Sequence, residues 1–179
     1  LLSMALSDLG NGLENPSFLD ETPLYLALPE PQRLEPDDEN LFKYLKSHGV
    51  RQQFQGLCRI YRKGHAGMIF ALSDAATAIV QGKYPRMIIA GTDSLINFDD
   101  LSRLDDQHRL KTTLNADGFM PGEAASAFLL ETTASAKKRN AQPRAVGKLD
   151  RDRHAALLHP VEVDVVLETS HNRTGSGHT

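Results

Sequence analysis

The sequence predicts an α/β fold in which a parallel-rich mixed sheet is flanked by helices. Short apolar runs, bounded by turn-forming or charged residues, alternate along the chain with longer stretches whose apolar residues recur at helical spacing. Such alternation of strands and helices is typical of a parallel sheet with helices on its faces. With 179 residues, the chain is also long enough to bury a core of ordinary size.

The first part of the chain supplies two predicted helices and two predicted strands. Leucines recur at helical spacing over residues 1–13, and glycines near the end of this stretch would stop the helix. The apolar run at residues 23–29 lies between two prolines and predicts a buried strand. Residues 39–48 predict a helix, and the loosely alternating residues 54–62 predict a strand.

The remainder of the chain continues the alternation. A helix predicted at residues 66–81 would end at Gly82, where a C-cap glycine belongs. Its apolar stripe consists of Ile69, Leu72, Ala76, Ile79 and Val80. The basic residues 137–139 predict the last turn of another helix. The other predicted elements are strands at 86–90, 124–130, 141–149 and 161–167, short helices at 98–105 and 154–158, and a long loop at 107–118.

Composition narrows the classes of function. The net charge of -3 gives no basic surface, so we expect no nucleic-acid partner. No apolar stretch approaches the roughly 20 residues of a membrane-spanning helix, so we expect no membrane association. The single cysteine, Cys58, excludes an internal disulfide framework and predicts a cytoplasmic protein. Asp105, Asp106 and His108 are expected to face solvent, and neither a metal nor a cofactor is expected.

The first candidate site is the turn between the strand at residues 54–62 and the helix that follows it. Gly64 would break the strand and the helix would begin at Ala66, so that His65 lies on a tight corner above the helix N-terminus. That end of a helix offers free backbone N–H groups and about half a positive charge. Such a corner suits a nucleophile, and the small residues Gly64, Ala66 and Gly67 permit a strained backbone there.

The second candidate site is the run at residues 117–125, Asp-Gly-Phe-Met-Pro-Gly-Glu-Ala-Ala. Gly118 and Gly122 allow backbone turns that a side chain would block. Phe119 can line an apolar channel. Glu123 enters a predicted buried strand, where its carboxylate would need hydrogen-bond donors or a cation.

In order and spacing, these features resemble the nucleophile-bearing half of a β-ketoacyl synthase, over about residues 64–131. The strand at residues 87–94, Met-Ile-Ile-Ala-Gly-Thr-Asp-Ser, and the helix at residues 101–104, Leu-Ser-Arg-Leu, fit the same family pattern. There Gly91 would permit close contact near the two-fold axis of these dimeric enzymes. The pattern places a nucleophilic cysteine on residue 65, where this chain has His65.

The resemblance implies a thiolase-like fold, of which this chain represents mainly the N-terminal half, without the first strand. Residues 1–149 would form a β-ketoacyl synthase N-terminal-like domain, and residues 150–179 a C-terminal segment that is partly mobile. The family's two catalytic histidines belong to a C-terminal half. The run at residues 170–179 is only superficially similar to the loops that carry them.

The resemblance also implies a function in fatty acid or polyketide-type metabolism, with acyl carrier protein or acyl-CoA as partner. His65 would occupy the nucleophile position of a degenerate acyl-transfer site. Substrate binding would involve Gly64, Ala66, Gly67, Gly118, Phe119 and Gly122, whereas Glu123 would be structural.

Two alternatives stay open at this point. In the first, the protein is an active acyl-transferring or decarboxylating enzyme in which His65 acts as a base. In the second, it is a non-catalytic subunit that dimerises with an active synthase. The resemblance implies dimerisation, either as a homodimer or as a heterodimer with a related synthase.

Overall fold

The computed structural model describes residues 1–13, 16–30, 59–141, 145–149 and 163–169. The helices are α1 (Leu2–Asn11), α3 (Gly67–Val80), α4 (Phe98–Asp106) and α5 (Thr133–Lys138), together with the 3-10 helices η1 (Pro16–Glu21) and η2 (Gly64–Ala66). The strands are β1 (Leu24–Leu28), β2 (Arg59–Arg62), β3 (Arg86–Ser94), β4 (Glu123–Thr132), β5 (Ala145–Leu149) and β6 (Val163–Thr169).

The described strands form one mixed sheet in the order β2–β1–β3–β4–β6–β5. Strand β1 pairs in parallel with β2 on one side and with β3 on the other. The pairings β3–β4, β4–β6 and β6–β5 are antiparallel. The predicted α/β class with helices flanking a mixed sheet is therefore confirmed. The division of the chain at residue 149 stays a prediction, although β6 lies in the same sheet as the earlier strands.

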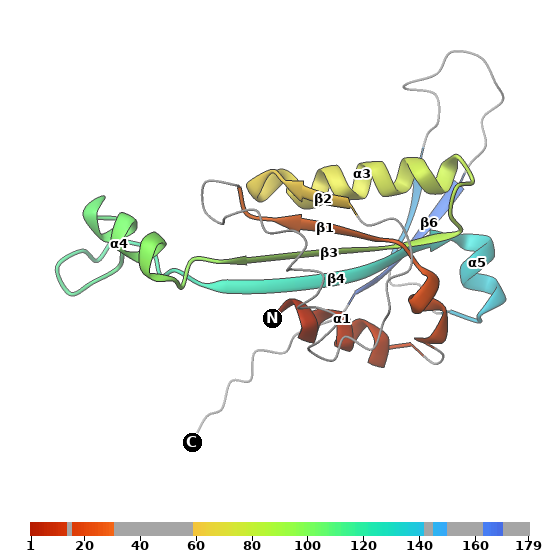
Figure 1. Ribbon diagram of the computed structural model, residues 1–179, viewed down its shortest axis with the longest axis horizontal. Coiled ribbons are helices and arrows are strands. Elements are labelled where there is room, and N and C mark those ends of the chain that lie inside the picture. Colours follow the sequence, from red (N-terminus) through yellow and green to blue (C-terminus); the bar gives the residue numbers. More distant parts are fainter. Residues whose placement is uncertain (14–15, 31–58, 142–144, 150–162, 170–179) are drawn as a thin grey trace, which may run out of the picture.

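Helices cover both faces of the sheet, with α3 on one face and α1 on the other (Figure 1). Alternate residues of β1 point to opposite faces of the sheet. Leu24, Leu26 and Leu28 pack with α1, whereas Tyr25 packs with α3. The residues of β3 alternate in the same way between the two faces of the sheet. A strand buried on both faces carries an almost continuous apolar run, which explains why these two strands could be recognised in the sequence.

The apolar stripe predicted for α3 is partly wrong. Ala76 and Ile79 are buried as expected, but Ile69 is 69% exposed. The buried face of α3 is built largely of small residues, namely Gly67, Ala71, Ala75, Ala76 and Ala78. A Cβ on Gly67 would come within 3.2 Å of the Ala27 Cβ, so the helix lies too close to β1 for large side chains at this end. The face of α3 that is buried is therefore the one whose small residues let the helix approach β1 closely, and not the one with the largest apolar side chains.

The ends of the helices follow the local signals. Gly82 has a φ of 72°, its N–H donates to the Ile79 carbonyl, and the Lys83 N–H donates to the Ala78 carbonyl. This pair of bonds is the Schellman motif, and it confirms the predicted C-cap glycine. Asn97 accepts a hydrogen bond from the Asp100 N–H and caps α4.

The predicted helices at residues 39–48 and 154–158, and the tail at 170–179, lie outside the described residues. The described helices contain none that is long and apolar enough to cross a membrane.

A polar cluster joins β2 to α3 just before the turn that carries His65. The Tyr61 hydroxyl donates to Oδ2 of Asp74 at 2.8 Å, and Nη1 of Arg59 donates to the same oxygen at 2.7 Å. The Tyr61 and Tyr25 rings lie 5.5 Å apart, and the Arg59 guanidinium lies 5.1 Å from the centre of the Tyr61 ring. These contacts hold the start of the turn against α3.

Replacing Tyr61 by Phe removes the bond to Asp74, which should lower the free energy of unfolding by about 1 kcal/mol at neutral pH. Burial, together with the Asp74 carboxylate, raises the pKa of Tyr61 above its usual value of 10.0. Below that value the phenol is neutral in both states, so Tyr61 adds no pH dependence. At higher pH the unfolded chain loses a proton that the folded chain retains, and stability falls.

Urea unfolding at several pH values checks this expectation. Between about pH 10 and 12, wild type should lose stability faster than Tyr61→Phe, because the variant lacks this phenol. Parallel losses in the two proteins would show that Tyr61 is not the group responsible.

Candidate functional site

The turn after β2 bends where Gly64 adopts a left-handed backbone, with a φ of 51°. A Cβ at Gly64 would also come within 2.8 Å of Oε1 of Glu30. The Ala66 N–H donates to the Lys63 carbonyl at 3.2 Å, which closes η2, and α3 begins one residue later. The structure therefore contains the expected corner, with His65 exposed on it.

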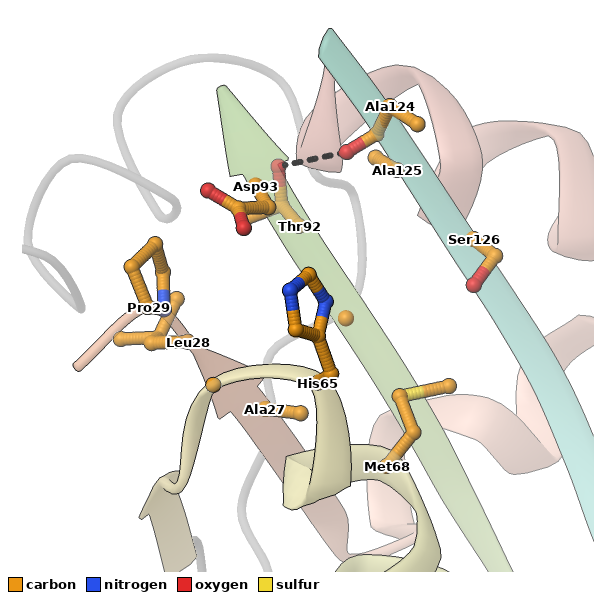
Figure 2. A pocket seen from close by; sticks show the side chains of 12 residues that line it. Ala27, Leu28, Pro29, His65, Met68, Thr92, Asp93, Ala124, Ala125 and Ser126 are labelled. Carbon is orange, nitrogen blue, oxygen red and sulfur yellow. Dashed lines mark hydrogen bonds between the residues drawn. The ribbon is translucent and has the colours of Figure 1, made fainter. Parts of the chain in front are cut away.

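His65 projects into an open pocket of about 220 Å³ (Figure 2). The pocket lies over the carboxyl-terminal residues of β1 and β3, beside the turn that follows β2. The start of β4 supplies the remaining wall. The lining residues are Ala27, Leu28, Pro29, Gly64, His65, Met68, Gly91, Thr92, Asp93, Ala124, Ala125 and Ser126.

The pocket combines a largely apolar wall with a few polar groups. His65 and Asp93 are its titratable residues, and Thr92 and Ser126 add hydroxyls. The Thr92 hydroxyl donates to the Ala124 carbonyl at 3.2 Å, which ties β3 to β4 at the rim (Figure 2). An imidazole in this position can accept or donate a proton.

The N-terminus of α3 adds a second chemical property. Ala66 at the N-cap has no capping side chain, and the first turn contains no acidic residue. The Gly67 N–H donates to the Gly64 carbonyl, so it is the helix dipole that favours negative charge on a group bound beside His65. A thiol is absent from the described pocket lining.

The structure brings together only part of the predicted site. Gly64 and His65 line the pocket, whereas Ala66 and Gly67 complete the turn and the helix start. The described pocket lining does not include Gly118, Phe119 or Gly122, which lie between α4 and β4. Their predicted role in substrate binding stays a prediction.

The run at residues 117–125 instead has a visible structural role in its loop. A Cβ on Gly118 would overlap the backbone of Leu110. The Phe119 N–H donates to the Arg109 carbonyl at 2.9 Å, and the Arg109 guanidinium lies 5.4 Å from the Phe119 ring centre. The Gly122 carbonyl accepts from the Leu95 N–H at 3.0 Å.

The expectation that Glu123 enters a buried environment is wrong. Glu123 is exposed at the first residue of β4, where Oε2 accepts a hydrogen bond from the Ser94 hydroxyl at 3.2 Å. The fully buried carboxylate belongs to Glu131 near the other end of the strand, where Nε of Arg139 donates to Oε1 at 2.8 Å. The antiparallel pairing places Glu123 opposite Ser94, at the projecting end of the two strands.

Sequence reasoning assigned no role to Met68 or Asp93, although both line the pocket. The sequence contains a pattern that could have predicted the position of each residue. Met68 lies one helical turn beyond His65, and residues three apart share a helix face. Asp93 follows a buried apolar run that ends at the carboxyl edge of a parallel strand.

No family model matches the chain. The putative polyketide beta-ketoacyl synthase 2 of Streptomyces halstedii is 31% identical over 108 residues, covering 54% of this chain. The chain spans 26%, about a quarter, of the length of that relative. This match supports homology to ketosynthases over that part of the chain.

Two solved structures of the ketosynthase from module 6 of the bacillaene synthase of Bacillus subtilis 168, one of them a mutant, have TM-scores of 0.54 and 0.50 against this chain. Their sequence identities are 13% and 12%. The matches cover 85% and 88% of this chain, but 29% and 31% of those chains. The fold of this chain is therefore part of the thiolase-like ketosynthase fold.

One contact in the pocket can be tested by substitution. A Cβ on Gly91 would lie 2.6 Å from Sδ and 3.0 Å from Cγ of Met68. Gly91→Ala should therefore destabilise the protein by about 1–3 kcal/mol, because Met68 must shift. In a Met68→Ala background this cost should shrink, giving a measurable coupling in a double-mutant cycle.

Gly122→Ala is the matched control for that cycle. Nothing lies within 4 Å of a Cβ at this position, so we expect a change within about 0.5 kcal/mol. Urea unfolding gives the free energies of the four proteins of the cycle and of Gly122→Ala. Strict additivity of Gly91→Ala and Met68→Ala would contradict the contact.

Proposed function

We propose that this chain is a ketosynthase-like protein of fatty acid or polyketide-type metabolism whose acyl-transfer site is degenerate. It binds an acyl group, presented as a thioester of acyl carrier protein or coenzyme A, in the pocket beside His65. It does not condense that group. The observation that carries the proposal is an imidazole in the pocket, at the start of α3, where a condensing enzyme needs a thiol.

The chemistry of the two side chains differs at this position. The positive end of a helix lowers the pKa of a thiol and stabilises the thiolate that attacks a thioester. An acyl-imidazole, by contrast, is readily lost to water. The chain's Cys58 precedes β2 in the sequence, whereas the turn follows β2, so it does not replace the missing nucleophile.

The cysteine content also supports a cytoplasmic location, which is part of this proposal. The homology to a polyketide synthase component supports acyl carrier protein as the source of the acyl group.

Intact-mass analysis after incubation with acetyl-CoA and with an acetylated acyl carrier protein tests the site. Wild type should carry no stable acyl adduct. His65→Cys should gain the mass of one acetyl group, because the thiol then lies at the start of α3 beside the acyl pocket.

Cys58→Ala provides the matched control. Combined with His65→Cys, it should leave the adduct unchanged, which excludes acylation of Cys58. A stable adduct on wild type that His65→Ala abolishes would show that the histidine itself is the nucleophile. The degenerate-site proposal would then be wrong.

A second observation concerns association. The segment between β3 and β4, residues 95–122, carries α4 and projects from the end of the two strands (Figure 1). Phe98 and Leu114 on this projecting arm are 82% and 98% exposed, and Ile96 and Met120 are also exposed. Exposed large apolar side chains concentrated in one region are typical of interaction sites. We propose that the arm pairs with a second copy of this chain, a related synthase being the alternative partner.

Sedimentation equilibrium measures this association directly. Wild type should have the mass of two chains, and Phe98→Asp combined with Leu114→Asp should have the mass of one, because charge in an apolar interface is costly. Met4→Asp alters an exposed apolar residue of α1 and should leave the mass unchanged. A wild-type protein of one-chain mass would contradict self-association.

A further inference from the structure

His65 is the basic side chain among the residues that line the pocket. It is exposed, and its ring projects into the open space of the pocket (Figure 2). An imidazole can take a proton from a neighbouring group and then return it, so the same side chain serves as general base and general acid. The site therefore holds a group that can move a proton at a bound ligand.

The backbone that carries His65 is held on both sides. Gly64 before it adopts a left-handed backbone, and the Ala66 N–H after it donates to the Lys63 carbonyl at 3.2 Å. The Gly67 N–H donates to the Gly64 carbonyl, and Gly67 packs closely against β1 at the start of α3. The imidazole thus starts from a fixed point of the pocket rim, which is the condition for a positioned proton acceptor.

The pocket lining decides which group can accept an acyl chain from a thioester. The described lining contains no thiol. The Thr92 hydroxyl already donates to the Ala124 carbonyl, and Ser126 belongs to the β4 wall rather than to the turn. Water reaches the ring, because His65 is exposed and the pocket opens to solvent. Water is therefore the acceptor that the imidazole can activate.

The rest of the site suits a thioester and the charge that forms on it. Leu28, Pro29, Ala124 and Ala125 give the pocket apolar walls against which an acyl group can lie. When water adds to a thioester carbonyl, the carbonyl oxygen becomes negative. The dipole of α3 is positive at the end beside His65, and it favours that negative oxygen.

We propose that this site hydrolyses acyl thioesters, with the His65 imidazole as the base that activates water. This inference rests on the proposed acyl-binding function, and it is compatible with the loss of condensation because water attack needs no thiol on the protein. His65 is then a catalytic residue for a reaction other than condensation.

The proposed step balances without a further reactant. The imidazole takes one proton from water while the water oxygen bonds to the carbonyl carbon of the thioester. The C–S bond then breaks, the sulfur leaves with the electron pair of that bond, and the imidazolium gives its proton to the sulfur. One thioester and one water become one carboxylic acid and one thiol, and the neutral imidazole is restored.

Hydrolysis of acetyl-pantetheine, followed with a chromogenic disulfide that reacts with the released thiol, tests the inference. All proteins carry Cys58→Ala, which removes the single thiol of the chain from the assay. The kcat/KM of this protein should exceed the rate constant of free imidazole with the same thioester, because binding brings the carbonyl to the ring. Adding His65→Gln or His65→Ala should lower kcat about 100-fold and change KM little, because neither residue can act as a base.

His108→Asn is the matched control for the loss of a histidine. His108 is also exposed, but it lies in the loop after α4 and outside the described pocket lining. Its φ of 52° is one that asparagine adopts more readily than most residues, so the variant should fold and keep the full rate. Circular dichroism checks the fold of every variant, and calorimetry with the amide analogue of acetyl-pantetheine measures binding without hydrolysis.

The outcomes separate this inference from the proposed function. If the protein binds the amide analogue but releases thiol no faster than imidazole does, or if His65→Gln keeps the rate, hydrolysis by His65 is wrong while acyl binding stands. If it binds neither the analogue nor the thioester, both are wrong. An acetyl group trapped on His65 or Ser126 by rapid acid quench and located by mass spectrometry would show a covalent route and overturn the role of His65 as base.

Discussion

The close packing of α3 against the sheet is the constraint on which the candidate site depends. Gly67 allows the first turn of the helix to lie against Ala27, and alanines continue the contact along the buried face. Large residues on this face would lift the helix and carry the turn away from the ends of the strands. The cluster of Arg59, Tyr61 and Asp74 holds the other side of the turn, because it joins β2 to the same helix. His65 therefore owes its position to contacts made by other residues.

The fold of this chain and the side chain at its candidate site are two separate questions. The fold and the partial sequence match relate it to ketosynthases. The side chain at the turn is an imidazole, whose chemistry differs from that of a thiol.

The arm at residues 95–122 is held together by contacts within its own loop. The side-chain amide of Asn115 donates to the carbonyls of His108 and Leu110, at 2.6 and 3.1 Å, and Gly118 lets the chain pass against Leu110. These contacts organise the loop internally. Gly118 and Phe119 of the motif thus have contacts within the loop, whereas a Cβ at Gly122 would meet nothing within 4 Å, and Phe98 and Leu114 of the arm are exposed.

Most elements could be predicted from the sequence because their signals are local. The leucine repeat of α1, the apolar run of β1 between prolines, and Gly82 at the end of α3 each depend on a few neighbouring residues. The corner at His65 was predictable for the same reason, since Gly64 can adopt a left-handed backbone. The buried face of α3 was not, because it depends on the distance between the helix and β1. Glu123 and Glu131 both lie in β4, and only the strand pairing decides which carboxylate is buried.

The sequence by itself determined the order of strands and helices, the turn, and the identity of the residue on it. Local periodicity and backbone preference are sufficient for those properties. Tertiary structure alone decided that Ala27, Met68, Asp93 and Ser126 line one pocket with His65. They come from four elements whose proximity arises from parallel and antiparallel pairing over as many as 99 positions of sequence, from Ala27 to Ser126. No local pattern encodes such a distance, because it follows from the packing of the whole sheet against its helices.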